Sequence, residues 1–94
     1  MNTASVPRSF SIGRLVATPR VLEEIPCWDL YRALSRHTAC DWGDVCPEDR
    51  RQNDDALRHG LRLLSAYHSA DGKKFWIITE GDRSATTILF PDEY

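Results

Sequence analysis

The chain has 94 residues, of which 41% are hydrophobic and 28% are charged, a composition typical of a folded domain rather than a disordered segment. A chain of this length forms one domain with a modest core, which leaves no room for a separate cofactor-binding domain. Twelve basic and fourteen acidic residues give a net charge of -2, so bulk charge alone predicts neither nucleic-acid nor membrane binding.

The sequence shows neither the apolar stretch of a secretory signal nor an apolar run long enough to span a bilayer. We therefore expect a cytoplasmic protein with a flexible tail over residues 1–9 and a single domain over residues 10–94. The odd number of cysteines argues against a disulfide framework. His37, Cys40 and Cys46 lie close in sequence but match no standard zinc spacing. We predict no metal site and no cofactor.

Apolar and polar residues alternate over residues 10–17, which predicts a strand. Thr18 and Pro19 are typical of the cap and the first residue of a helix, and Pro26 is expected to end it. The next helix is predicted over residues 27–37. Its expected apolar face has the spacing i, i+3, i+4 and i+7 and is formed by Cys27, Leu30, Tyr31 and Leu34.

A third helix is predicted from Pro47 to His59, with Gly60 as its C-terminal stop. Strands are predicted over residues 61–68, 73–79 and 85–90, joined by turns that contain Asp-Gly and Gly-Asp pairs. The order β-α-α-α-β-β-β predicts an α+β fold with three short helices packed on one face of a small antiparallel sheet. We expect the core to contain Ile12, Leu22, Ile25, Leu30, Leu34, Leu57, Leu63, Trp76, Ile78, Ile88 and Phe90.

No catalytic residue is predicted. None of the cysteines lies in a recognisable reactive context, and His59 and His68 flank a strand, where surface histidines are common. The sequence contains no glycine-rich phosphate loop, paired-histidine metal motif or dinucleotide fingerprint.

Acidic residues gather around Trp42 and the start of the third helix. The predicted partner-binding set is Asp41, Trp42, Asp44, Glu48, Asp49, Asp54 and Asp55. Such a patch can imitate nucleic-acid phosphates or dock on a basic protein surface, with the tryptophan as an anchor. The alternative is a solvated helix face whose acids pair with Arg50, Arg51 and Arg58, and a Trp42 that fills the core. The sequence leaves both interpretations open.

Glu80, Asp82 and Arg83 form a second candidate surface, in a polar turn attached to a strand. The alternative is a purely structural turn, in which Asp82 accepts backbone hydrogen bonds and Arg83 pairs with Glu80 or with an acidic helix.

Segments 13–19, 41–44, 63–67, 76–84 and 91–94 together resemble a family of small, largely uncharacterised bacterial proteins encoded on plasmids, integrative elements and phages. The likeness covers nearly the whole chain from Phe10 and departs over residues 23–28 and at Cys46, which stands where a conventional capping residue is expected. The resemblance implies no reaction. It implies a mobile element, a setting in which small proteins protect the element from host defences.

We therefore expect a non-enzymatic accessory protein of a mobile element that binds and inhibits a host defence complex, of the anti-CRISPR or anti-restriction type. Its partner is expected to be a protein or ribonucleoprotein complex of the host, rather than nucleic acid directly. The alternative is a small ribonuclease toxin of a toxin–antitoxin system that acts through the C-terminal sheet, which carries Arg62, His68 and Lys74. The slightly acidic net charge disfavours that alternative. A DNA-binding regulator ranks last, because Glu48 and Asp49 would repel phosphate.

Overall fold

The structure of the protein is a computed structural model, and it describes residues 10–94. Its elements are β1 (Arg14–Ala17), α1 (Pro19–Glu24), α2 (Cys27–Thr38), α3 (Pro47–His59), β2 (Leu63–His68), β3 (Lys74–Thr79), β4 (Ala85–Leu89) and the 3-10 helix η1 (Pro91–Glu93). The fold is α+β, and the helices and strands follow one another in the predicted order. The predicted flexible tail, residues 1–9, lies outside the described residues.

Local chemistry sets the start of α1 and both ends of α3. The Thr18 hydroxyl accepts a hydrogen bond from the Val21 amide at 3.2 Å, which satisfies one of the orphan donors at the start of α1. α3 begins after Cys46, whose Sγ accepts from the Asp49 amide at 3.4 Å. It ends at Gly60, whose φ of 67° is in the left-handed region that favours glycine.

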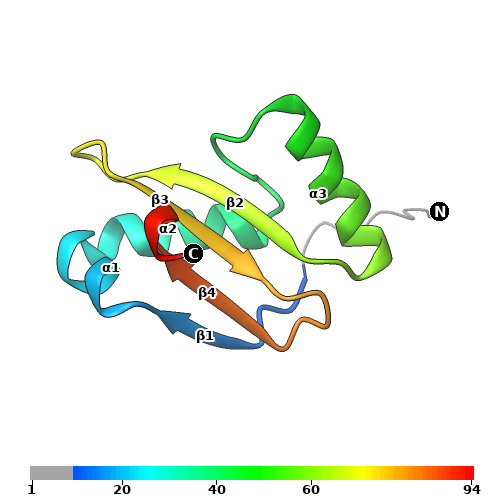
Figure 1. Cartoon of the computed structure of the whole chain (residues 1–94), viewed down its shortest axis with the longest axis horizontal. Helices are drawn as coiled ribbons and strands as arrows, with labels where there is room; N and C mark the ends of the chain where they lie inside the picture. Colours follow the sequence, from blue (N-terminus) through cyan, green and yellow to red (C-terminus); the bar gives the residue numbers. More distant parts are fainter. Residues whose placement is uncertain (1–9) are drawn as a thin grey trace.

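The sheet has the strand order β1-β4-β3-β2 and is mixed (Figure 1). β2, β3 and β4 form the predicted antiparallel meander. β1 pairs with β4 in parallel, with Leu15 opposite Thr86, so the prediction of a wholly antiparallel sheet is wrong at this strand. The physical reason is the connection: three helices and two strands separate β1 from β4, and a connection of that length permits a parallel pairing that a hairpin does not.

Only two of the three helices cover one face of the sheet. α1 and α2 lie behind the sheet in Figure 1, whereas α3 lies beside β2 and η1 lies in front. Ala56 and Leu57 of α3 pack with Leu63 of β2 and with Trp42 in a second, smaller cluster of buried residues. The prediction that all three helices pack on one face is therefore corrected for α3, whose short apolar stripe reaches only the end of β2.

Seven of the predicted core residues are buried, namely Ile25, Leu30, Leu57, Leu63, Ile78, Ile88 and Phe90. Ile12, Leu34 and Trp76 are half-buried, and the prediction for Leu22 is wrong, because its side chain is 62% exposed. The helix-covered face of β3 is formed by Phe75 and Ile77 rather than by Trp76.

The core face of α2 is also turned relative to the prediction. Leu30, Ala33 and His37 are buried, whereas Cys27 and Tyr31, expected on the apolar face, are exposed. The predicted apolar face did not include His37, so its centre lay too far toward Tyr31.

We predict that two identical substitutions will have very different effects on stability. Trp42 is 2% exposed and Trp28 is 72% exposed. Trp42→Ala leaves a cavity and should lower the free energy of unfolding by about 3–5 kcal/mol, whereas Trp28→Ala should change it by at most about 0.5 kcal/mol. Urea unfolding of the two variants measures both values, and equal losses would contradict this description of the core.

Candidate functional site

The loop acids of the predicted partner-binding set are engaged within the molecule. Asp41 Oδ2 accepts a hydrogen bond from Arg36 Nε at 2.8 Å, and Asp41 Oδ1 accepts from the Gly43 amide at 3.2 Å. The Arg36 guanidinium lowers the pKa of the Asp41 carboxyl, with the Gly43 amide contributing in the same direction. Asp44 Oδ2 accepts from His68 Nδ1 at 2.7 Å. These pairs are exposed, so the acids remain accessible, and the Arg36 guanidinium offsets the charge of Asp41.

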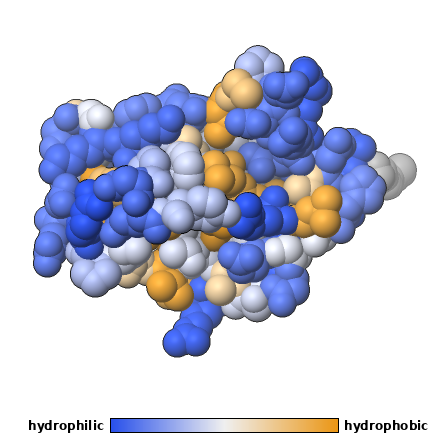
Figure 2. Space-filling view, in the orientation of Figure 1, coloured by the Kyte–Doolittle hydropathy of each residue, from blue (hydrophilic) through white to orange (hydrophobic). Residues whose placement is uncertain are grey.

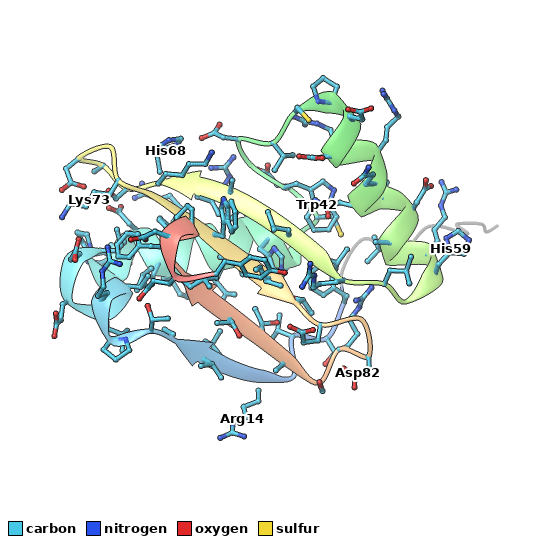
Figure 3. All side chains as sticks on the ribbon, viewed as in Figure 1. Arg14, Trp42, His59, His68, Lys73 and Asp82 are labelled. Carbon is cyan, nitrogen blue, oxygen red and sulfur yellow. The ribbon has the colours of Figure 1, made fainter. Side chains whose placement is uncertain are left out.

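Trp42 fills the core, which is the second of the two interpretations of the sequence. Its ring stacks on Phe10 with centroids 6.1 Å apart and meets the edge of the His37 ring at 5.8 Å. Its Nε1 donates to Asp54 Oδ1 at 3.0 Å, and Figure 3 shows the side chain between α3 and the sheet. Trp42 therefore offers no exposed ring to a partner, and Asp54 is occupied in satisfying the buried indole N–H.

The remaining acids of the set, Glu48, Asp49 and Asp55, are exposed on α3. Within residues 10–94 none of them forms an ion pair, and neither do Arg50, Arg51 and Arg58 on the same helix. The surface of α3 thus carries unpaired charges of both signs. The structure does not bring the seven predicted residues together as one negative surface around an aromatic anchor.

The second candidate surface, the turn at residues 80–83, is held by backbone hydrogen bonds. Arg83 Nη1 donates to the carbonyls of Leu61 at 2.7 Å, Glu80 at 3.1 Å and Gly81 at 3.3 Å. Its Nη2 donates to the Ala56 carbonyl in the last turn of α3 at 3.2 Å, where a cation is favoured by the helix dipole. Asp82 Oδ1 accepts from the Ser84 amide at 3.0 Å. Asp82 accepts a backbone hydrogen bond, as the structural alternative predicted. Arg83 also shapes the turn, but it bonds backbone carbonyls rather than the carboxylate of Glu80 or of an acidic helix, and Glu80 remains exposed.

A buried chain of polar side chains runs through the interior. His37 Nδ1 lies 2.6 Å from Ser65 Oγ and His37 Nε2 lies 2.8 Å from Thr79 Oγ1. Thr79 Oγ1 lies 2.7 Å from Thr86 Oγ1, which donates to the Ile12 carbonyl at 2.8 Å. All four of these side chains are 0% exposed.

The Ile12 carbonyl sets the donor-to-acceptor direction of all these side-chain hydrogen bonds, because a carbonyl oxygen can only accept. Thr86 has donated its one proton to Ile12, so it must accept from Thr79, and Thr79 must in turn accept from His37 Nε2. Nδ1 of the neutral ring is then an acceptor and receives the Ser65 hydroxyl proton. Ser65 and His37 have the contact of a nucleophile and its base, but both are fully buried, so the pair has no access to a substrate.

Burial lowers the pKa of His37 to about 4, with the positive charge of Arg83 contributing less. The ring is therefore neutral at neutral pH, which is the state that this series of hydrogen bonds requires.

Cys46 caps α3, and no disulfide joins the three cysteines. Within residues 10–94 no group of three or more His, Cys, Asp or Glu side chains is arranged to hold a metal ion. None of the helices described there is long and apolar enough to cross a membrane.

The sequence analysis missed an apolar hollow on the surface of α2. Cys27, Trp28 and Tyr31 line a shallow depression of about 450 Å³ on α2, and Trp28 and Tyr31 are 72% and 67% exposed. We call these three residues the aromatic surface. Trp28 lies two positions before the buried Leu30, which places it on the opposite side of a helix from the core. That spacing is the signal in the sequence that could have identified it.

A smaller hollow of about 100 Å³ lies between α2 and the end of β2. It is lined by Asp29, Arg32, Ala33, Arg36, Tyr67, His68 and Ala70. Because His68 Nδ1 donates to Asp44, the Nε2 of a neutral ring is the atom left with a lone pair. This hollow combines a histidine oriented by a carboxylate with two arginines.

A comparison of the chain with protein-family models, curated proteins and solved structures finds no match. The arrangement of the residues themselves is therefore the basis for assigning a function.

We predict that stability falls as the pH drops from about 6.5 to about 4. An unfolded histidine has a pKa near 6.5, whereas His37 in the folded protein has a pKa of about 4, so protonation favours the unfolded chain. The contribution is fully present above pH 6.5 and is lost as the pH approaches 4, by about 3 kcal/mol in total. Urea unfolding as a function of pH measures it.

The control is a His59→Gln variant, which should keep the loss between pH 6.5 and 4. His37→Gln should be less stable at neutral pH and should lack that loss. Asp41, Asp71 and Asp82 have lowered pKa values and so affect stability below this window. An unchanged pH profile in His37→Gln would contradict the assignment.

Proposed function

We propose that the protein is a non-enzymatic binding protein of a mobile element, which inhibits a host defence complex of the anti-CRISPR or anti-restriction type. The observation that carries the binding role is the aromatic surface on α2, with its tryptophan and tyrosine more than two-thirds exposed. The mobile-element setting rests on the sequence resemblance, which supplies the class of partner but not the surface.

The aromatic surface has the chemistry of an interface centre. Tryptophan and tyrosine dominate the energetics of protein–protein interfaces, because each buries a large area while losing few side-chain rotamers. Trp28 and Tyr31 are one helical turn apart on a helix of twelve residues, so they are presented on a rigid element. Figure 2 shows the face of the sheet opposite α2, where mostly hydrophilic residues surround separate hydrophobic patches.

The acids of α3 have a different role in this proposal. α3 and the N-terminal end of α2 lie at opposite ends of the molecule in Figure 1, so Glu48 and Asp55 do not border the aromatic surface. Unpaired surface charges act over distance: they steer encounter with a basic partner, and salt screens them over about 8 Å at physiological ionic strength. Complexes that process nucleic acids have such basic surfaces.

We predict that the double variant Trp28→Ala, Tyr31→Ala loses partner binding while it remains folded. Two truncated interface anchors should weaken binding by about 100-fold or more, since each typically contributes at least about 1–2 kcal/mol. The measurements are quantitative pull-down of tagged protein from the bacterial host and a plasmid-interference assay in cells with an active defence system. The wild type should retain a nucleic-acid-processing complex and protect the plasmid, and the variant should do neither.

Two matched variants sharpen this experiment. Tyr94→Ala removes an aromatic ring that is 63% exposed on the other face and should leave binding unchanged. Glu48→Lys with Asp55→Lys should slow association mainly at low salt, and it avoids Asp54, whose reversal would disturb Trp42. If the aromatic double variant binds like the wild type and the α3 variant does not, α3 is the contact surface. If the wild type retains no such complex, the proposed function fails.

A second candidate function, a small ribonuclease toxin, has one observation in its favour. The hollow beside β2 contains His68, oriented by Asp44, together with Arg32 and Arg36. In such a site the histidine could act as a general base while the arginines hold phosphate. Arg36 is already paired with Asp41, and this reduces the positive charge available to an RNA phosphate.

We predict that expression of the wild-type protein leaves bacterial growth and total RNA intact. Growth curves and RNA integrity measure this directly, with His68→Asn as the matched variant. Arrest of growth with RNA cleavage by the wild type, abolished by His68→Asn, would establish the toxin instead and overturn the proposed inhibitor.

A further inference from the structure

The two edges of the sheet differ in whether their outward-facing backbone groups are hydrogen-bonded. At the β2 edge, Asn53 Nδ2 donates to the Leu64 carbonyl at 2.8 Å and Asn53 Oδ1 accepts from the Leu64 amide at 3.1 Å. The next outward-facing residue, Ala66, donates to the Trp42 carbonyl at 3.1 Å and accepts from the Asp44 amide at 2.7 Å. The outward-facing N–H and C=O groups of Leu64 and Ala66 thus already have hydrogen-bond partners. Another strand cannot pair with the middle of β2.

The β1 edge has no such cover. The Arg14 amide donates to Ser84 at 3.0 Å and the Thr18 amide donates to Ile88 at 3.1 Å, so alternate residues of β1 face β4. The backbone groups of Leu15 and Ala17 therefore point away from the sheet. Among residues 10–94 no group pairs with these two N–H and two C=O groups. We call them the open edge. Leu15 and Val16 are 48% and 41% exposed beside it.

We propose that a second copy of this chain pairs with the open edge. β1 of each copy lies antiparallel to the other, with Leu15 opposite Ala17 of the second copy, so that two four-stranded sheets join across a two-fold axis. In this register the four outward groups of each copy pair with those of the other, and Val16 lies on the axis against its own counterpart.

The limits of β1 select this register. A shift of the symmetric pairing in one direction would place Ala17 opposite Gly13, whose φ of 61° is not extended. A shift in the other direction would place Leu15 opposite Pro19, which has no N–H to donate. A shift by one residue would set the outward N–H and C=O groups of one copy opposite residues whose own backbone groups point back into their sheet.

Charge complementarity supports a second copy as the occupant. Arg14 projects from the open edge (Figure 3) and forms no ion pair within the described residues. In the proposed register it lies opposite Thr18 of the second copy, on the same face of the joined sheet. The Thr18 hydroxyl donates to Glu93 Oε1 at 2.9 Å, and Asp92 lies next to it in η1. Asp92 is already paired with Arg20 at 3.0 Å, so Arg14 of each copy meets chiefly the charge of Glu93 of the other, twice across the axis.

Hydrogen exchange of the full chain tests the pairing residue by residue, from about 1 µM to about 1 mM protein, a range suited to a small interface. The amides of Leu15 and Ala17 should become protected as the concentration rises. Those of Val16 and Thr18 are bonded within the sheet and should be protected throughout, which makes them the internal control. Sedimentation velocity over the same range should show a dimer.

Charge reversal supplies the second test. Arg14→Glu should weaken dimerisation by about tenfold or more, because a charge-assisted contact is lost at two places. Arg51→Glu changes the net charge equally on α3 and should have no effect. Ala17→Pro removes a donor that only the second copy uses, so it should give a folded monomer.

The inference is overturned by a monomer at every concentration with Leu15 and Ala17 exchange unchanged. It is also overturned by an unchanged dimerisation affinity in Arg14→Glu, or by a dimer that is lost in Trp28→Ala, Tyr31→Ala, since the aromatic surface would then be the dimer contact. Recovery of a host complex by the wild type is a separate measurement, so dimerisation and the proposed function can fail independently.

Discussion

The carbonyl oxygen of Ile12 accepts a hydrogen bond from the Thr86 hydroxyl. This bond determines which atom donates in each of the buried side-chain hydrogen bonds that link Thr86 of β4, Thr79 of β3, His37 of α2 and Ser65 of β2. A buried network is stable only when each donor and acceptor is satisfied, so His37 must face inward as a neutral ring. That requirement fixes the rotation of α2 about its axis. With Leu30, Ala33 and His37 turned to the core, Trp28 and Tyr31 are left in solvent. The aromatic surface is thus a consequence of how the interior satisfies its polar groups.

Features that depend on neighbouring residues could be predicted from the sequence. Thr18 with Pro19 starts α1, Pro47 starts α3 and Gly60 ends it, because capping and left-handed φ values act within a few residues. The rotation of α2 could not be predicted in this way. His37 becomes a core residue only because Ser65 and Thr79, 28 and 42 positions further along the chain, satisfy its nitrogens. A periodicity that scores histidine as polar cannot include that information.

The candidate site shows the same division. An aromatic residue in an acidic loop fits both an interface anchor and a core plug, and the choice for Trp42 depends on Phe10 and Asp54, which reach it through the tertiary fold. All six predicted acids are exposed, so the exposure of that surface was predictable. The bonds that Asp41, Asp44 and Asp54 form within the molecule were not. The parallel pairing of β1 was equally inaccessible, since β4 follows it only after 67 intervening residues, numbers 18 to 84.

The open edge and the aromatic surface are linked through geometry. An antiparallel pairing about a two-fold axis perpendicular to the sheet keeps corresponding faces on the same side. In the proposed dimer, α1 and α2 of both copies therefore cover one face, and the two aromatic surfaces point to the same side of the joined sheet. A host complex that presents two equivalent sites within reach would bind both copies, with the second contact made intramolecularly and at a high effective concentration. The proposed inhibitor would in this way hold an oligomeric target more tightly than one copy could, without any additional contact residue.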